Sequence, residues 1–184
     1  MSSAYRPEFE AALRLFARVS EAMHELGFQR PILVGGAAAE FYSQSAINTG
    51  DFDLCTPRQD TLEAEMQKVG FIKPSGPGQM TKGWIHPELR LGFEIVANIP
   101  MDGNYDRETL ALIENFTDEG AFIVISVEDL IADRMGQYAS GTARDRLQQA
   151  QTLYRLHPSL DKVYLERRIR EETIDEHGIE ALES

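Results

Sequence analysis

The sequence predicts an α/β fold, with a small mixed β-sheet packed against helices and followed by a helical C-terminal portion. Up to about Ser126, short apolar runs flanked by turn residues alternate with stretches of helical periodicity, and extended segments dominate the middle of the chain. From Val127 onwards the periodicity is helical almost to the end. We therefore expect a core over residues 1–126 and a helical portion over residues 127–184, joined in one compact unit.

The N-terminal third predicts two strands and three helices. Apolar residues recur at helical spacing after Pro7 and stop before Gly27: Phe9, Leu13, Phe16, Met23 and Leu26. The run "PILV", residues 31–34, predicts a buried strand, and "AAAEFY", residues 37–42, predicts a helix. A second strand is expected at "DFDL", residues 51–54, and a helix over residues 62–69 that ends at Gly70.

The middle of the chain predicts mainly strands. The Gly and Pro content of "KPSGPGQ", residues 73–79, indicates a loop. On either side of His86-Pro87, "MTKGWI" at residues 80–85 and "LRLGFEIVANI" at residues 89–99 predict antiparallel neighbours. A helix is expected over residues 107–115, and "AFIVIS" at residues 121–126 predicts the last strand.

Charged residues spaced four apart predict a solvated helix near the C-terminus. The pairs are Glu166 with Arg170, Arg167 with Glu171 and Arg168 with Glu172. This run needs no functional interpretation.

Composition narrows the classes of function. The chain has 184 residues and 42% hydrophobic content, enough to fold around its own core. Its single Cys55 and four histidines cannot form a disulfide framework or a four-ligand zinc site, so a metal ion would be bound by oxygen. No basic leader or long apolar run is present, so we expect a cytosolic protein without a membrane partner.

The formal net charge of −12 disfavours non-specific nucleic-acid binding and favours a small-molecule or protein partner. Part of this charge is concentrated in "EETIDEHGIEALES", residues 171–184. The rest of the surface therefore remains able to form a local basic pocket.

A glycine pair, Gly35-Gly36, lies between the first strand and the following helix. Backbone N–H groups at a helix start are free to bind an anion, and the helix dipole favours phosphate there. The spacing is not that of dinucleotide-binding folds, so a simple tight turn is the alternative.

Two aspartates one residue apart, Asp51 and Asp53, project from the same face of the second strand, while Phe52 and Leu54 face the core. Their mutual repulsion would be relieved by a hard divalent cation such as Mg²⁺. A solvated strand end is the alternative.

A third carboxylate, Glu94, lies in the apolar segment "LGFEIVA", where alternation separates it from Phe93 and Ile95. It is either exposed on an edge strand or a third ligand beside Asp51 and Asp53 in a two-metal site for phosphoryl transfer.

Together these residues resemble the polymerase-β-type nucleotidyltransferase superfamily, especially its small bacterial and abortive-infection-type members. The likeness covers about residues 27–156 and rests on Gly35-Gly36, the segment "TGDFDL" from Thr49 to Leu54, and Glu94. It implies that Gly35, Gly36 and Thr49 contact a nucleoside triphosphate. It also implies that Asp51, Asp53 and Glu94 bind two Mg²⁺ or Mn²⁺ ions, and that a nucleoside monophosphate passes to an acceptor hydroxyl.

The chain differs from many members of this superfamily at two positions. Gly36 stands where many have serine, and Ile47 stands where many have an arginine. The second difference removes a positive charge, so catalysis would need another cation. Arg134, at the border of a predicted apolar helix face, is the candidate, and a surface ion pair is its alternative. Lys82 and Arg90 are weaker candidates.

The sequence therefore predicts a metal-dependent nucleotidyltransferase with catalytic Asp51, Asp53 and Glu94. Its acceptor, whether RNA, protein or a small molecule, is not specified by the residues. A catalytically inactive nucleotide-binding or regulatory module is the first alternative, favoured by Ile47. A metal-dependent phosphohydrolase is the second, since the same carboxylates would serve if water replaced the acceptor.

Overall fold

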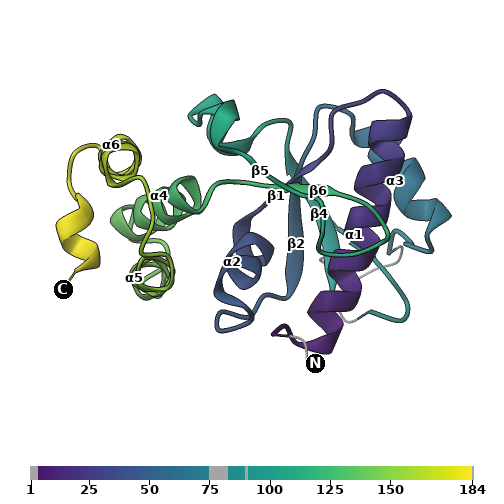
Figure 1. Cartoon of the computed structure of the whole chain (residues 1–184), viewed down its shortest axis with the longest axis horizontal. Coiled ribbons are helices and arrows are strands. Elements are labelled where there is room, and N and C mark those ends of the chain that lie inside the picture. The colour runs from purple at the N-terminus through teal and green to yellow at the C-terminus, as the bar shows by residue number, and fades with distance from the viewer. Residues whose placement is uncertain (1–3, 75–82, 90, 184) are drawn as a thin grey trace.

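In the computed structural model of the chain, residues 4–74, 83–89 and 91–183 are described. They form a mixed six-stranded sheet with helices packed on it and a group of helices at the C-terminal end (Figure 1). The predicted α/β class is confirmed.

The six strands run in the order β3-β4-β2-β1-β6-β5. They are β1 (Ile32–Val34), β2 (Asp51–Cys55), β3 (Trp84–Ile85), β4 (Gly92–Ala97), β5 (Ala111–Ile113) and β6 (Phe122–Val124). The pairs β2–β4 and β1–β6 are parallel, and the other pairs are antiparallel. The antiparallel pairing expected across His86-Pro87 is confirmed, with Trp84 opposite Phe93. Most of the loop expected at residues 73–79, and residues 80–82, lie outside the described residues.

The helix expected over residues 107–115 is wrong. A short 3-10 helix, η2 (Arg107–Thr109), is followed directly by β5, which pairs antiparallel with β6. The backbone of Ala111–Ile113 therefore takes its hydrogen bonds from another strand. Pairing of this kind depends on the neighbouring strand and overrides local helical periodicity.

The helices are α1 (Pro7–Glu25), α2 (Gly35–Ser43), α3 (Gln59–Lys68), α4 (Val127–Ala139), α5 (Arg146–Leu156) and α6 (Lys162–Glu172). Pro7 occupies the first turn of α1, where its missing N–H costs nothing, and Gly27 follows the helix end with φ +80°. Two further 3-10 helices are η1 (Pro100–Gly103) and η3 (Ile179–Leu182).

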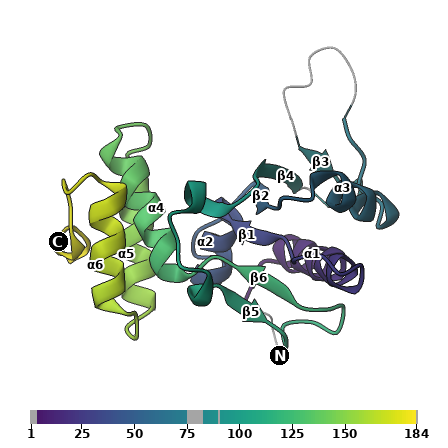
Figure 2. The ribbon, with the colours of Figure 1, turned by 90° about the horizontal axis from the view of Figure 1, so that it is seen from above.

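The main core lies between the sheet and α1. Phe9 and Phe16 of α1 pack on the sheet residues Phe52 and Phe93, whose rings stack at 4.7 Å between centroids. All four side chains are almost completely buried. Because strand side chains alternate, Asp51, Asp53 and Glu94 must face the other side of the sheet. Figure 2 shows α1 and α3 on one side of the sheet and α2 and α4 on the other.

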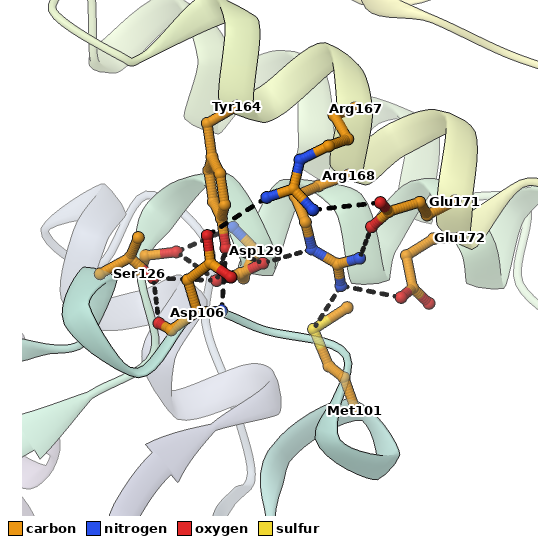
Figure 3. A network of polar contacts seen from close by, with 10 residues as sticks. Met101, Asp106, Ser126, Asp129, Tyr164, Arg167, Arg168, Glu171 and Glu172 are labelled. Atoms are coloured by element: carbon orange, nitrogen blue, oxygen red, sulfur yellow. Dashed lines mark hydrogen bonds and ion pairs between the residues drawn. The ribbon is translucent and has the colours of Figure 1, made fainter.

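A buried polar network attaches α6 to the first turn of α4 (Figure 3). The Asp129 carboxylate accepts hydrogen bonds from the Ser126 hydroxyl at 2.8 Å, the Tyr164 hydroxyl at 2.8 Å and the Arg168 Nε at 2.7 Å. Asp129 and Arg168 are both buried, so each charge depends on the other for neutralisation.

The Arg168 guanidinium also contacts two carboxylates of its own helix and the η1 segment. It donates to Glu171, to Glu172 at 2.9 Å and to the Met101 sulfur at 3.6 Å. Burial lowers the pKa of Arg168, but these hydrogen bonds and the bond to Asp129 outweigh it and raise the pKa overall. Arg168 therefore stays charged and joins α4, α6 and η1.

The prediction of a solvated α6 is wrong for this one residue. All three expected pairs form: Glu166–Arg170 at 2.6 Å, Arg167–Glu171 at 3.1 Å and Arg168–Glu172 at 2.9 Å. Arg168, however, is 1% exposed because it shares a helix face with the buried Leu165 and Ile169. Charge spacing alone does not reveal which face packs inward.

Among the described residues, no helix combines the length and apolar character that crossing a lipid bilayer requires.

Replacement of Arg168 should strongly destabilise the fold. Arg168→Leu leaves the Asp129 carboxylate buried without a counter-charge, so we expect the free energy of unfolding to fall by about 3–5 kcal/mol. The matched control is Arg167→Leu on the same helix, which removes ion pairs whose side chains are about half exposed. It should cost about 0–1 kcal/mol. Urea denaturation of the wild type and the two variants measures both losses of stability. Equal losses would show that the buried ion pair stabilises the fold no more than the exposed pairs do.

Candidate functional site

The three predicted carboxylates come from adjacent strands on one face of the sheet. In the parallel pair β2–β4, Asp53 lies opposite Glu94 and Asp51 lies opposite Gly92. Asp51 is exposed, whereas Asp53 and Glu94 are half-buried. The strand register thus brings all three residues to the same edge of the core.

Their side chains do not form a closed metal cage. A Cβ atom on Gly92 would lie 3.0 Å from Oδ1 of Asp51, and one on Gly35 would collide with Oδ2 of Asp53. Asp51 therefore leans toward β4 and Asp53 leans toward the start of α2. Within residues 4–74, 83–89 and 91–183, no three His, Cys, Asp or Glu side chains gather closely enough to hold a metal ion.

The glycine pair is required by the close approach of Asp53 and Thr49. Gly35 has φ +62°, a conformation that favours glycine, and a side chain there would strike the Asp53 carboxylate. A side chain on Gly36 would strike the Thr49 hydroxyl. The Gly36 N–H donates a hydrogen bond to Asp53. One of the backbone donors expected to contact phosphate is thus already bonded to a carboxylate.

Thr49 fixes the backbone entering β2. Its hydroxyl donates to the carbonyl of Asp51 at 2.9 Å, and its N–H donates to Oε2 of Glu40 at 2.7 Å. Glu40 is completely buried in α2 and is paired with Arg6. The two guanidinium hydrogen bonds hold the carboxylate at 2.5 and 2.9 Å, and they raise the pKa of Arg6.

Glu40 is a positioning residue that sequence reasoning missed. It connects the first helix after the glycines to the loop that leads into Asp51. The available signal was a single carboxylate inside the apolar stretch "AAAEFY", where a charge needs a partner.

Asp53 is in an unfavourable environment for a charged carboxylate. Burial raises its pKa above the ordinary value of 3.8, and the nearby charges of Asp51 and Glu94 raise it further. The Gly36 N–H and Arg134 act in the opposite direction without cancelling the shift. Clustered carboxylates of this kind are oxygen donors suited to Mg²⁺, so the donor chemistry fits a hard cation.

A cavity of about 280 Å³ lies between this face of the sheet and α4. Gly35 and Asp53 line it from the sheet side, Met101 from η1, and Asp133 and Gln137 from α4. Burial raises the pKa of Asp133, although Arg134 beside it favours the charged form. Asp133 and Gln137 were not identified from the sequence, since nothing local indicates that α4 packs over the carboxylates.

Arg134 does not line this cavity, but its charge acts on Asp53. Its NH1 group donates to Asp133 and to Gln137, both at 3.2 Å, and its side chain is 4% exposed. The alternative of a surface ion pair is wrong about the surface location, but the expected pairing with a neighbouring carboxylate does form, to Asp133. Burial lowers the pKa of Arg134, whereas the charges of Asp133 and Asp53 raise it. Its Nε has no hydrogen-bond partner among the described residues.

Two weaker cation candidates, Lys82 and Arg90, lie outside the described residues. Ile47 packs partly buried against the core and supplies no charge. Among the three candidate cations, Arg134 is therefore the one that the described part of the chain shows near Asp53.

Asp53→Asn should stabilise the fold at neutral pH. The folded state holds the Asp53 proton more tightly than the unfolded chain, so the ionised carboxylate lowers the free energy of unfolding above its raised pKa. That cost disappears as the pH falls to the ordinary value of 3.8. Asparagine keeps an acceptor for the Gly36 N–H and removes the charge. The variant should gain stability at pH 7, and the gain should shrink toward pH 4.

Urea denaturation at the two pH values measures this difference. Asp118→Asn is the matched control, because the Asp118 side chain is 95% exposed and the substitution should change stability little at either pH. A destabilised Asp53→Asn at pH 7 would mean that the Asp53 carboxylate holds the turn together as an ion.

Comparison with known proteins adds a structural likeness. No known family and no curated protein matches the sequence. Among solved structures, the chain is similar to an antigenic nucleotidyltransferase-like protein from Paracoccidioides brasiliensis, with a TM-score of 0.62 and 16% sequence identity. The match covers 97% of this chain and 94% of that one. At this identity the likeness concerns the fold: the chain has a nucleotidyltransferase-like fold.

Proposed function

We propose that this protein is a metal-dependent nucleotidyltransferase that transfers a nucleoside monophosphate from a nucleoside triphosphate to an acceptor hydroxyl in the cytoplasm. The observation that carries the proposal is the placement of Asp51, Asp53 and Glu94 on neighbouring strands beside the glycine turn that begins α2. The likeness in fold supports the same general class.

Asp51, Asp53 and Glu94 would hold Mg²⁺ or Mn²⁺. Bound there, the ions would neutralise charge on the triphosphate and on the reacting oxygens. Asp51 is exposed, so its carboxylate is free to turn away from Gly92 toward the other two. Burial raises the pKa of Asp53 most, and repulsion by Asp51 and Glu94 raises it further, so a bound cation would stabilise the charged carboxylate.

The residues at the start of α2 would hold the triphosphate. The first N–H groups of a helix have no partner within the helix, and the dipole places positive potential there. Gly35 and Gly36 let Asp53 and Thr49 pack closely against the start of α2, and Thr49 fixes the loop that enters β2. The phosphates would bind first-turn N–H groups other than that of Gly36, which is bonded to Asp53. Arg134 would contribute positive potential near Asp53.

In the reaction, the acceptor oxygen forms a bond to the α-phosphorus while the bond between the α-phosphorus and the bridging oxygen breaks, and pyrophosphate leaves. The hydroxyl proton would pass to Glu94, the half-buried carboxylate opposite Asp53. The remaining contribution of the protein is positioning and electrostatic stabilisation.

A catalytically inactive nucleotide-binding or regulatory module is the second candidate. One observation favours it: Arg134 is buried and already bonded to Asp133 and Gln137, so it would not replace the charge absent at Ile47 by direct contact with phosphate. This module would bind a triphosphate at α2 without transferring it.

Divalent cations should stabilise the protein through the three carboxylates. A ligand at about 100 times its dissociation constant adds about 2.7 kcal/mol to the free energy of unfolding. We expect Mg²⁺ to raise the melting temperature of the wild type and to leave the double variant Asp51→Asn with Asp53→Asn unchanged.

The double variant Asp118→Asn with Asp145→Asn is the matched control. It removes the same charge from side chains that are mostly exposed, 95% and 62%, and should respond to Mg²⁺ as the wild type does. A magnesium response that survives in the Asp51 and Asp53 double variant would place the cation elsewhere.

Transfer itself is tested with each nucleoside triphosphate labelled at the α-phosphate, incubated with Mg²⁺ or Mn²⁺ and a cell extract. A transferase should attach label to an acceptor and release pyrophosphate, and the Asp51 and Asp53 double variant should do neither. Labelled nucleotide without labelled acceptor would indicate a phosphohydrolase. Binding without either product would indicate the inactive module.

A further inference from the structure

A further cavity of the described residues opens at the other end of β1 from the candidate site. It has a volume of about 610 Å³ and opens at the start of β1, where Arg30 and Ile32 line it, whereas Gly35 follows the other end of that strand. Volumes of 300–1,000 Å³ are typical of pockets for small organic molecules. We call it the distal pocket.

The inner surface of the distal pocket is mainly apolar. It is lined by Ile32, Cys55, Ile99, Leu110, Leu112 and Ile123, which come from four strands and the segments that follow β4 and precede β5. Leu112 is 51% exposed and Ile99 is 39% exposed, although both are large apolar side chains. A ligand with an apolar body would cover this surface.

The charged residues at the distal pocket are all basic. Arg30 and Arg107 line it together with His24, and no Asp or Glu is among its lining residues in the described part of the chain. The protein as a whole carries 30 acidic against 18 basic residues. An acid-free pocket on such an acidic protein is complementary to an anion. The distal pocket is therefore a local basic pocket, which the concentration of acidic residues near the C-terminus allows elsewhere on the surface.

The two arginines are not equivalent. Arg30 is held by Glu21 at 3.0 Å and by the carbonyl of Ala121 at 3.1 Å, so its charge is already neutralised. Arg107 is exposed and makes no ion pair with the described residues. Its acidic neighbours in the chain, Asp106 and Glu108, line an adjacent pocket with Arg107 but do not line the distal pocket, and Asp106 is paired with Arg167. Arg107 is therefore the group positioned to bind an anion.

We propose that the distal pocket binds an anionic small molecule with an apolar or aromatic body. The body packs on Ile32, Leu112 and Ile123, and the acidic group, a carboxylate, sulfonate or phosphate, bonds to Arg107. The proposed binding does not depend on the proposed transferase reaction, because the distal pocket uses none of the three carboxylates and none of the residues at the start of α2, although Cys55 lines both cavities.

Binding is tested with two fluorescent probes that share one ring system. The anionic probe is 8-anilinonaphthalene-1-sulfonate, and the uncharged probe is N-phenyl-1-naphthylamine. The folded wild type should bind one molecule of the anionic probe per chain, and more tightly than the uncharged one. Arg107→Ala should weaken the anionic probe about tenfold, as expected for a hydrogen bond to a charged group. The uncharged probe should be unaffected.

Leu112→Glu tests whether the probes bind in the distal pocket. It places a carboxylate on the apolar surface and should weaken the binding of both probes. Matched controls lie side by side on α5: Arg155→Ala removes an exposed arginine, and Leu156→Glu alters a leucine that is 50% exposed. Neither should change binding. Urea denaturation checks that each variant is folded.

Equal affinity of the wild type for the two probes would overturn the proposed anion preference. An effect of Leu156→Glu as large as that of Leu112→Glu would overturn the location. Both readouts measure binding alone, so they stand whether or not nucleotidyl transfer is observed.

Discussion

The alternation of side chains along β2 is the constraint on which both the core and the candidate site depend. Phe52 and Leu54 face α1 and are completely buried, while Asp51 and Asp53 face the opposite side. Because β2 lies between β4 and β1, its register also sets the face of each neighbour. A shift of one residue would bury two carboxylates and expose two large apolar side chains. Core packing therefore holds the acidic cluster in place.

The second constraint is electrostatic and comes from the C-terminal helices. The first turn of helix α4 contains Asp129, which is fixed by Arg168 of α6. One turn later, Asp133 lines the cavity and Arg134 lies near Asp53. The position of the cavity wall thus depends on an ion pair outside the cavity. Buried pairs of this kind cost desolvation energy, but they tolerate few alternative arrangements.

The sequence predicted the features that depend on local pattern. The β2 alternation, the change from strand to helix at the glycine pair and the place of Glu94 follow from spacing within a few residues, and the register of β2 with β4 agrees with them. The expected glycine turn, however, is the first two residues of α2 itself. The sequence did not predict Glu40, whose partner Arg6 directly precedes α1, or Arg168, whose partner is in α4. The sequence did not predict β5 either, because the hydrogen bonds that make it a strand are formed with β6. Partners distant in sequence leave no periodic signal.

The parallel pairing of β1 with β6 has a consequence for synthesis. Ile32 pairs with Ile123 and Leu33 pairs with Val124, so one side of β1 has no strand partner until most of the chain has been made. A ribosome adds residues one after another, and an unpaired apolar strand is a site of aggregation during that interval. Pairings between such distant residues also slow folding, because closing a long loop costs entropy before the strand contacts that stabilise it can form.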